Sequence, residues 1–583
     1  MINTSRYGFI TEDNISHISR SKSAVAGTKS RQDGRGSTKV IGSIYVSKSD
    51  CTKVGICFLD YNTSELIMST YQDSQTYVRT MHQLYVYSPT ELLVLEHHFK
   101  PVDKLGLILQ SNLSDGIKLI HPKAIYYNIY EGIEYLKKFS VDVITNLEVE
   151  FADKELCLAA ANACIKSMIL STSSREILTR LKVKFQTCEN TMLIDHRTIV
   201  ELELVENKLD KKGNSLFKVL NKCCTKMGQR FLRNNILQPL TDSRSITLRY
   251  EAVQELKSNQ PILTELRKEM KSLQNFDVLL NCLVAGYDRN DIKINDQKIN
   301  NVLLLKSSLL CAVSLATFLT SQESHLSKEI YQILSSDDIN KALELINESI
   351  SEDCSWVSGS LELRNQKSFA VKSGKNGLLD ISRQLYQSIL NEVSQEVHDL
   401  AEEYNINLEY RFESNRGFFV RVKQSTLELL PDIFINRVQK RKIIECTTLN
   451  LMKQSSRFND VNLEITILSD KSIDNLYKDL TDYTAILFMV CEAFATLDLL
   501  CCFAFSAMIS DRSYCAPEIS TELQIKNGRH PVLETVLKDK FVPNDYFVSK
   551  LTSRFQIITG ANMSGKSVYL KQLSYLIIMG QMG

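Results

Sequence analysis

Short runs of alternating apolar and polar residues mark the chain from about 41 to 150. The run 54–58 alternates, and after a polar turn a second run begins at Leu66. A period of two is typical of strands that bury one face, so these runs predict a hairpin. A helical stretch over 75–84 and another strand over 91–95 follow. We therefore predict a small mixed α/β domain.

Helical periodicity dominates from about 150 to 400. Apolar residues at steps of three and four, which share one helix face, are Leu216, Leu220, Cys223, Met227 and Phe231. A second long helix is predicted over 381–401. The pattern becomes β-like between 403 and 447, and helices resume over 450–510. This order predicts a long helical domain that a short β-rich segment interrupts.

One apolar stretch, 483–509, has the length of a membrane span. Glu492 and Asp498 lie inside it, and insertion of an Asp costs roughly 2.5 to 3.5 kcal/mol. A central helix buried in a large helical domain explains the stretch better, and we expect no membrane partner.

Composition limits the possible functions only broadly. The 583 residues imply several domains, and 44% hydrophobic with 23% charged residues is ordinary for a soluble chain. The net charge is +1, so nucleic-acid binding would have to depend on local clusters. Fifteen scattered cysteines without a CxxC pair argue against a disulfide framework and a zinc module, and indicate a reducing compartment.

Positive charge is most concentrated in the β-like segment. Between 411 and 442 eight Lys and Arg residues face three acidic ones, an excess of five. Basic side chains on strands neutralise DNA phosphates, although a solvated basic surface gives the same count. The candidate DNA-binding residues are Arg411, Arg416, Arg421, Lys423, Lys440 and Arg441. Residues 1–40 are also mildly basic and predict a disordered arm.

The strongest motif lies near the end of the sequence. Gly560, Gly565, Lys566 and Ser567 complete the pattern GxxxxGK[ST]. An apolar run over 555–559 predicts a strand before the loop, and an apolar helix follows it. The glycines let backbone N–H groups converge on phosphate oxygens, Lys566 would reach the β- and γ-phosphates, and the Ser567 hydroxyl would bind Mg²⁺. The sequence therefore predicts ATP and Mg²⁺ as ligands.

A complete hydrolytic site also needs a carboxylate on a later strand. The sixteen residues after Ser567 contain no acidic side chain. Hydrolysis therefore cannot be completed within this sequence, no catalytic residue is assigned, and enzymatic activity stays open. We interpret the chain as a truncated product, and we expect the apolar helix after the loop to be uncovered.

Several segments resemble the MutS family in the family's own order. The segment 559–572 (TGANMSGKSVYLKQ) is similar to its phosphate-binding loop, and 525–534 and 541–545 are similar to the start of its ATPase domain. The segments 216–240 and 249–253 resemble its lever region. The resemblance covers about 40 to 583.

The details of the resemblance point to the meiotic, crossover-promoting branch of the family. The segments 192–195, 364–371 and 415–420 are most similar to that branch. The first hundred residues lack the Phe-x-Glu with which mismatch-repair members contact a mispaired base. This resemblance implies binding of double-stranded and branched DNA, a heterodimer with the fifth MutS homologue, and a location on meiotic chromosomes in the nucleus.

The resemblance also assigns roles around the loop. Phe541 would stack on the adenine, with Val542 and Asn544 beside it. Ala561 stands where the family has Pro, and Val568 replaces Thr and removes a hydroxyl that could bond a phosphate. The residues assigned to nucleotide are Gly560, Ala561, Asn562, Met563, Ser564, Gly565, Lys566, Ser567, Val568, Phe541, Val542 and Asn544.

The predicted fold class is multidomain α and α/β. The predicted parts are a basic arm (1–40), a mixed α/β connector domain (41–150), a helical lever domain in two parts (151–402 and 450–510) around a β-rich clamp insert (403–449), and a truncated P-loop ATPase domain (511–583). The predicted function is that of an ATP-gated DNA clamp subunit. Three alternatives stay open: a mismatch-repair subunit, a structural subunit with a non-hydrolysing loop, and an unrelated P-loop phosphotransferase.

Overall fold

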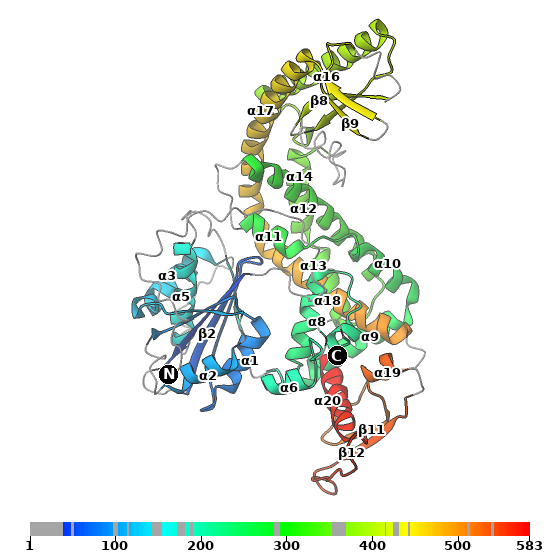
Figure 1. The fold of residues 1–583 in the computed structure, drawn as a ribbon. Coiled ribbons are helices and arrows are strands. Elements are labelled where there is room, and N and C mark those ends of the chain that lie inside the picture. The colour runs from blue at the N-terminus through cyan, green and yellow to red at the C-terminus, as the bar shows by residue number, and fades with distance from the viewer. Residues whose placement is uncertain are drawn as a thin grey trace, which may run out of the picture. The chain divides into compact units, whose positions relative to one another are not determined.

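Figure 1 shows the fold in a computed structural model of the chain. The described residues are 39–583, except 48–51, 97–102, 114–115, 141–153, 172–180, 187–189, 209, 211–212, 285–291, 352–368, 414–415, 424–430, 441–442, 510–513 and 538–540. Nearly all of the predicted basic arm lies outside the described residues, as does Arg441 of the candidate DNA-binding set.

The first folded part is built on a six-stranded sheet with the strand order β5-β4-β1-β2-β3-β6. Its strands are β1 (Val40–Val46), β2 (Lys53–Asp60), β3 (Glu65–Gln72), β4 (Glu91–Val94), β5 (Lys118–Ile120) and β6 (Lys182–Phe185). β1, β2 and β3 are antiparallel, and Asp60 pairs with Glu65 across the predicted hairpin turn. The outer strands join parallel to their neighbours, as expected where helices connect strands.

Helices cover this sheet, and apolar side chains are buried on both of its faces. The helical elements are α1 (Val78–Tyr87), α2 (Lys104–Asn112), η3 (Ala124–Tyr126), α3 (Ile129–Phe139) and α5 (Glu155–Ser171). α5 crosses β2 so closely that a side chain at Gly55 would lie 2.2 Å from the Leu156 backbone, which explains the glycine. α5 and β6 thus pack with the sheet, beyond the expected limit at 150.

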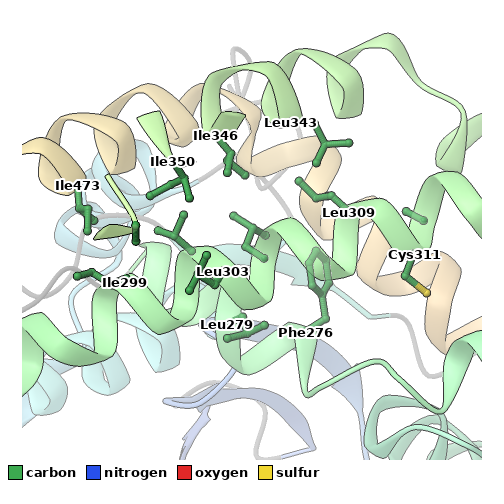
Figure 2. Packing of buried hydrophobic residues seen from close by; sticks show 14 of the residues in the cluster. Phe276, Leu279, Ile299, Leu303, Leu309, Cys311, Leu343, Ile346, Ile350 and Ile473 are labelled. Carbon is green, nitrogen blue, oxygen red and sulfur yellow. The ribbon is translucent and has the colours of Figure 1, made fainter. Parts of the chain in front are cut away.

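The helical part begins after β6 and contains most of the chain. Its helices are α6 (His196–Glu201), α7 (Leu216–Leu220), α8 (Lys226–Leu237), α9 (Ser243–Ser258), α10 (Gln260–Met270), α11 (Phe276–Val284), α12 (Ile292–Leu319), α13 (His325–Leu334), α14 (Asp337–Ser349), α16 (Gly377–Glu403), α17 (Leu449–Leu480), η6 (Thr481–Tyr483) and α18 (Thr484–Ile509). Figure 2 shows their core, where Leu303 of α12 lies among side chains of α11, α14 and α17.

One expectation for this part is wrong. The residues from Leu216 to Phe231, predicted to share one helix face, form two helices separated by a turn at 221–225. The turn forms because the Asp498 carboxylate of α18 accepts the backbone N–H groups of Cys224 and Thr225. The Thr225 hydroxyl then caps α8. A tertiary contact therefore overrides the local periodicity.

A four-stranded antiparallel sheet is inserted between α16 and α17, as predicted. Its strands are β7 (Glu409–Glu413), β8 (Gly417–Lys423), β9 (Ile435–Lys440) and β10 (Ile443–Thr447), in the order β7-β8-β10-β9. It packs against α17, where the rings of Phe412, Phe418 and Phe458 lie within 5.0 Å of one another, centroid to centroid. Figure 1 shows β8 and β9 beside the adjoining ends of α16 and α17.

Two helical segments in the described residues are long and apolar enough to cross a membrane by length and composition alone, Lys298–Leu319 and Leu449–Ile509. In each, 61% of the most apolar window is buried within the fold. α18 packs on α8 and α9, and its two internal acids both have partners. This packing is the one expected for 483–509 as a central helix of a helical domain.

The C-terminal part contains a two-stranded sheet and one long helix. β11 (Leu523–Gly528) pairs antiparallel with β12 (Asn544–Val548), and α19 (Leu533–Val536) and α20 (Lys566–Met582) complete it. The run 555–559, predicted as a strand, is not one. A segment becomes a strand only by pairing, and no described segment pairs with it.

α20 is covered along part of its length, contrary to the expectation of an uncovered helix. Tyr575, Ile578 and Met582 are buried in a cluster with residues of α6, α7 and α8. The first turns of α20 remain open to solvent, where Leu570 is half exposed.

Candidate nucleotide and nucleic-acid sites

The phosphate-loop motif forms an exposed turn that leads directly into α20. Gly565 has a φ of 94°, a left-handed conformation that favours glycine, and helix α20 begins at the next residue. Lys566 donates its ammonium N–H groups to the carbonyl oxygens of Gly560 and, at 3.0 Å, Ala561. A side chain at Gly560 would lie 2.7 Å from the Ser564 hydroxyl, so a larger residue there would require this exposed side chain to move.

These features fit a phosphate group. No described side chain caps the first turn of α20, so its N-terminal N–H groups face the loop without a protein acceptor from a cap. A helix N-terminus of this kind, with Lys566 folded over the loop, favours anions. Asn562, Met563, Ser567 and Val568 are exposed around it, and Met563 has a positive φ of 63°.

The segment predicted to hold the adenine packs near the same helix. Asn544 donates from its amide to Gln572 of α20 at 3.0 Å, and the Tyr546 hydroxyl donates to the Tyr569 carbonyl at 2.9 Å. Phe541 is only 8% exposed and lies beneath the Arg529 guanidinium, whereas Val542 is 77% exposed. The segment 541–548 therefore packs against the same helix, α20, that follows the loop. The stacking role of Phe541 stays a prediction.

The far end of α20 is held by α9. Arg249 donates to the carbonyl of Met582 at 2.6 Å and to the side chain of Asn235 at 2.7 Å, and Tyr250 donates to the carbonyl of Gly580. Burial lowers the pKa of Arg249 to about 10, so this side chain stays protonated at neutral pH. A positive charge beside the carbonyl end of a helix stabilises the helix.

α8 connects α20 with two other parts of the fold. Arg233 donates to the carbonyl of Val86 in α1 at 2.7 Å, and His82 of α1 lies 3.1 Å from the carbonyl of Leu237. At its other end α8 is capped through Asp498 of α18. α8 therefore contacts α20, the first sheet domain and the long helices at once.

The predicted DNA-binding residues lie on the inserted sheet. Arg411 is in β7 and pairs with Glu409 on its own strand, and Arg416 and Arg421 both pair with Glu445 of β10. Lys423 and Lys440 end their strands, and both pair with Ile443 in the backbone register. Glu409 and Glu445 lie just outside the stretch 411–442, where the excess of positive charge is five. Over 409–445, with these two glutamates included, the excess is three.

Sequence reasoning missed Glu445, the most informative residue of the sheet. It is 1% exposed and accepts from two arginines. The signal for it was its place in the strand 443–447, but only the register reveals that it lies opposite Arg421. In the described residues no group of three or more His, Cys, Asp or Glu side chains could hold a metal ion.

The fold and the loop thus define a multidomain, helix-rich protein with a mixed α/β domain and a phosphate-binding loop motif. Two family models match the chain: MutS domain II over residues 39–173 and MutS domain III over residues 197–504. The chain belongs to the MutS family, as its sequence segments predicted.

Similar proteins carry one recurring name. The chain is 44% identical to "MutS protein homolog 4" of Saccharomyces cerevisiae, over 93% of this chain and 63% of that protein. It is 41% identical to the protein of that name in Candida albicans, over 99% of this chain and 71% of that protein. The human protein of that name is 30% identical, over 91% of this chain and 57% of that protein. The chain therefore spans somewhat under two thirds of the yeast and human relatives.

Proposed function

We propose that this chain is a DNA-binding subunit of the MutS family whose hold on DNA is gated by ATP. Its targets are branched, Holliday-junction-like intermediates of meiotic recombination, and its effect is to promote crossovers. The observation that carries the proposal is membership of the family together with a phosphate-loop helix that is bonded to the long-helix body. The relatives named homolog 4 support the choice of branch.

The nucleotide part of the proposal rests on the loop. Residues 560–567 would hold the phosphates of ATP, with Lys566 neutralising their charge and the Ser567 hydroxyl binding Mg²⁺. Phe541, Val542 and Asn544 would hold the base. When bound, the nucleotide supplies negative charge at the start of α20, and the contacts of α20 with α8 and α9 pass a change in its position to the rest of the chain.

The DNA part rests on the inserted sheet. Its solvent face carries arginines on neighbouring strands, and such groups bind phosphates without regard to sequence. We further propose a nuclear location on meiotic chromosomes and a heterodimer with the fifth MutS homologue, both implied by the likeness to this branch of the family.

Two other functions follow from particular observations. A mismatch-repair role is the alternative within the family, because the chain is also 26% identical to "DNA mismatch repair protein MutS" of Caldicellulosiruptor bescii. A structural subunit with a loop that does not turn over ATP is the other, because the described residues contain no group of three or more His, Cys, Asp or Glu side chains that could hold a metal ion.

A competition assay separates the proposed junction-binding function from the mismatch-repair function. A labelled four-way DNA junction is bound to the full chain, then displaced with an unlabelled junction, a perfectly paired duplex or a duplex with one mismatch. The proposal predicts that the junction competes best, and that paired and mismatched duplexes compete equally. Preferential displacement by the mismatched duplex would replace the proposal with the repair function.

A further inference from the structure

The inserted sheet has one face in the helical core and one face away from it. Phe418 and Val420 of β8 point into the core with Ile444 of β10. Side chains alternate along a strand, so Phe419 and Glu445 lie on the opposite face. Both are nevertheless buried, at 2% and 1% exposure.

Two arginines cover these residues. The Arg416 guanidinium lies 4.6 Å from the centre of the Phe419 ring, and that of Arg421 lies 5.7 Å from it. Arg416 reaches one oxygen of Glu445 at 2.5 Å, and Arg421 reaches the other at 3.1 Å. Each guanidinium is thus held by a ring and by one oxygen of a shared carboxylate, while about a third of each side chain stays in solvent.

The charges are not balanced within the buried part of this cluster. Two guanidiniums share the one buried carboxylate of Glu445, and the second negative charge belongs to Glu413, a half-exposed side chain that lies 3.9 Å from Arg416. Each guanidinium has five N–H donors, and Glu445 accepts only part of them. Glu445 takes Nη1 of Arg416 and the Nε and Nη2 edge of Arg421, and a guanidinium binds two phosphate oxygens through parallel N–H groups.

The backbone around Arg416 is also fixed. Gly417 has a φ of 75°, and a side chain there would lie 2.5 Å from the Ser455 hydroxyl of α17. The same hydroxyl accepts the Phe418 N–H at 2.8 Å and donates to Leu451 at 2.6 Å. The position of Arg416 is therefore set by α17 as well as by Glu445.

We infer that Arg416 and Arg421 form a preorganised site for a backbone phosphate of DNA, and that Glu445 is its positioning residue. This inference rests on the proposed DNA-binding function and deepens it. A buried carboxylate between two arginines lowers the net charge of the face, but it fixes both guanidiniums before DNA arrives. Ordering two free arginine side chains on binding would cost conformational entropy instead.

Charge-conserving variants test the site. Arg416→Lys and Arg421→Lys keep the positive charge but lose the planar fork, so each should weaken binding of the full chain to a labelled duplex by about tenfold. Arg457→Lys is the matched control, because Arg457 is an exposed arginine of α17 that pairs with Glu392 at 3.3 Å. It should bind like the unaltered chain. If all three lysine variants bind equally well, the face is an ordinary basic surface and the inference is wrong.

Glu445→Gln tests the positioning role. Removing a negative charge strengthens DNA binding by simple electrostatics, and salt screens that gain. Loss of positioning weakens binding at every salt concentration. We therefore expect Glu445→Gln to bind DNA more weakly than the unaltered chain at high salt, where screening leaves the loss of positioning dominant. Tighter binding of this variant at every salt concentration would overturn the inference. Absence of DNA binding by the unaltered chain would instead overturn the proposed function, and the inference with it.

Discussion

The contact between Asp498 and Gly228 gives a stability prediction that can be worked out from the structure. Asp498 is fully buried and accepts from the Cys224 N–H at 2.9 Å, the Thr225 N–H at 2.7 Å and the Thr225 hydroxyl at 2.7 Å. A side chain at Gly228 would lie 2.2 Å from the same carboxylate. The two residues therefore lock the start of α8 onto α18.

Asp498→Ala leaves the buried Thr225 N–H group and the partly buried Cys224 N–H group without this acceptor. Each such group costs about 1 to 3 kcal/mol, and loss of the buried charge offsets part of the cost, so we expect a loss of about 3 kcal/mol. Gly228→Ala gains about 1 kcal/mol in helix propensity. It forces an overlap that costs about 1 to 3 kcal/mol, so the single variant should be destabilised or at best neutral.

The double variant Asp498→Ala/Gly228→Ala tests whether the two residues are coupled. With the carboxylate gone, the new methyl group at 228 loses the overlaps at 2.2 and 2.7 Å and keeps only that with the Cβ of residue 498 at 2.9 Å, so Gly228→Ala should cost less than in the unaltered chain. We expect a coupling free energy of about 1 to 3 kcal/mol between the two sites. Urea unfolding followed by circular dichroism measures the change in the free energy of unfolding for each variant. Because a chain of several domains need not unfold in one step, hydrogen exchange of peptides from 216–237 shows whether the change lies at the start of α8. Equal effects of Gly228→Ala in both backgrounds would refute the reasoning.

Three further predictions concern the loop and the contacts between parts of the chain. Lys566→Ala should weaken binding of a fluorescent ATP analogue at least about tenfold, measured by anisotropy, because the loop loses its only cationic side chain; unchanged affinity would remove the loop from the nucleotide site. Burial lowers the pKa of His82 in the folded chain. As the pH falls through about 6.5, the His82 imidazole is therefore protonated in the unfolded chain before it is protonated in the folded chain. The stability that neutral His82 contributes is complete above that pH. It is lost progressively as the pH falls from there to the lower pKa of His82 in the folded chain. His82→Gln should flatten this part of a urea-midpoint profile, and an unchanged slope would contradict the assignment. Glu492 pairs with Lys182 at 2.8 Å and Lys184 at 2.6 Å, so Glu492→Gln should lower stability by about 1 kcal/mol or less in thermal melts, and high salt should abolish the difference; a salt-independent loss would point to packing instead.

The fold was predictable where a segment carries its own period. The hairpin at 53–72, the helix 377–403 and the inserted strands all follow from local alternation or helical spacing. The break at 221–225 was not predictable, because the group that takes its N–H bonds comes from Asp498, far away in sequence. The prediction of a strand over 555–559 failed for a related reason, because a strand forms only by pairing with a second segment.

The candidate sites show the same division. The phosphate loop is a contiguous motif, so its residues and the helix that follows were predictable from spacing alone. The basic segment was visible as a count of charges, but a count cannot reveal that Arg416 and Arg421 share Glu445. That relation depends on strand register and on a turn fixed by Ser455.

Nucleotide-dependent release of DNA tests the central claim most directly. A preformed complex between the full chain and a labelled four-way junction is challenged with excess unlabelled junction, with and without ATP and Mg²⁺, and the dissociation rate is followed by fluorescence. We predict that ATP changes the dissociation rate for the unaltered chain and leaves that of Lys566→Ala unchanged. Equal rates for both proteins under both conditions would contradict ATP gating, and a structural subunit with an idle loop would then be the better account.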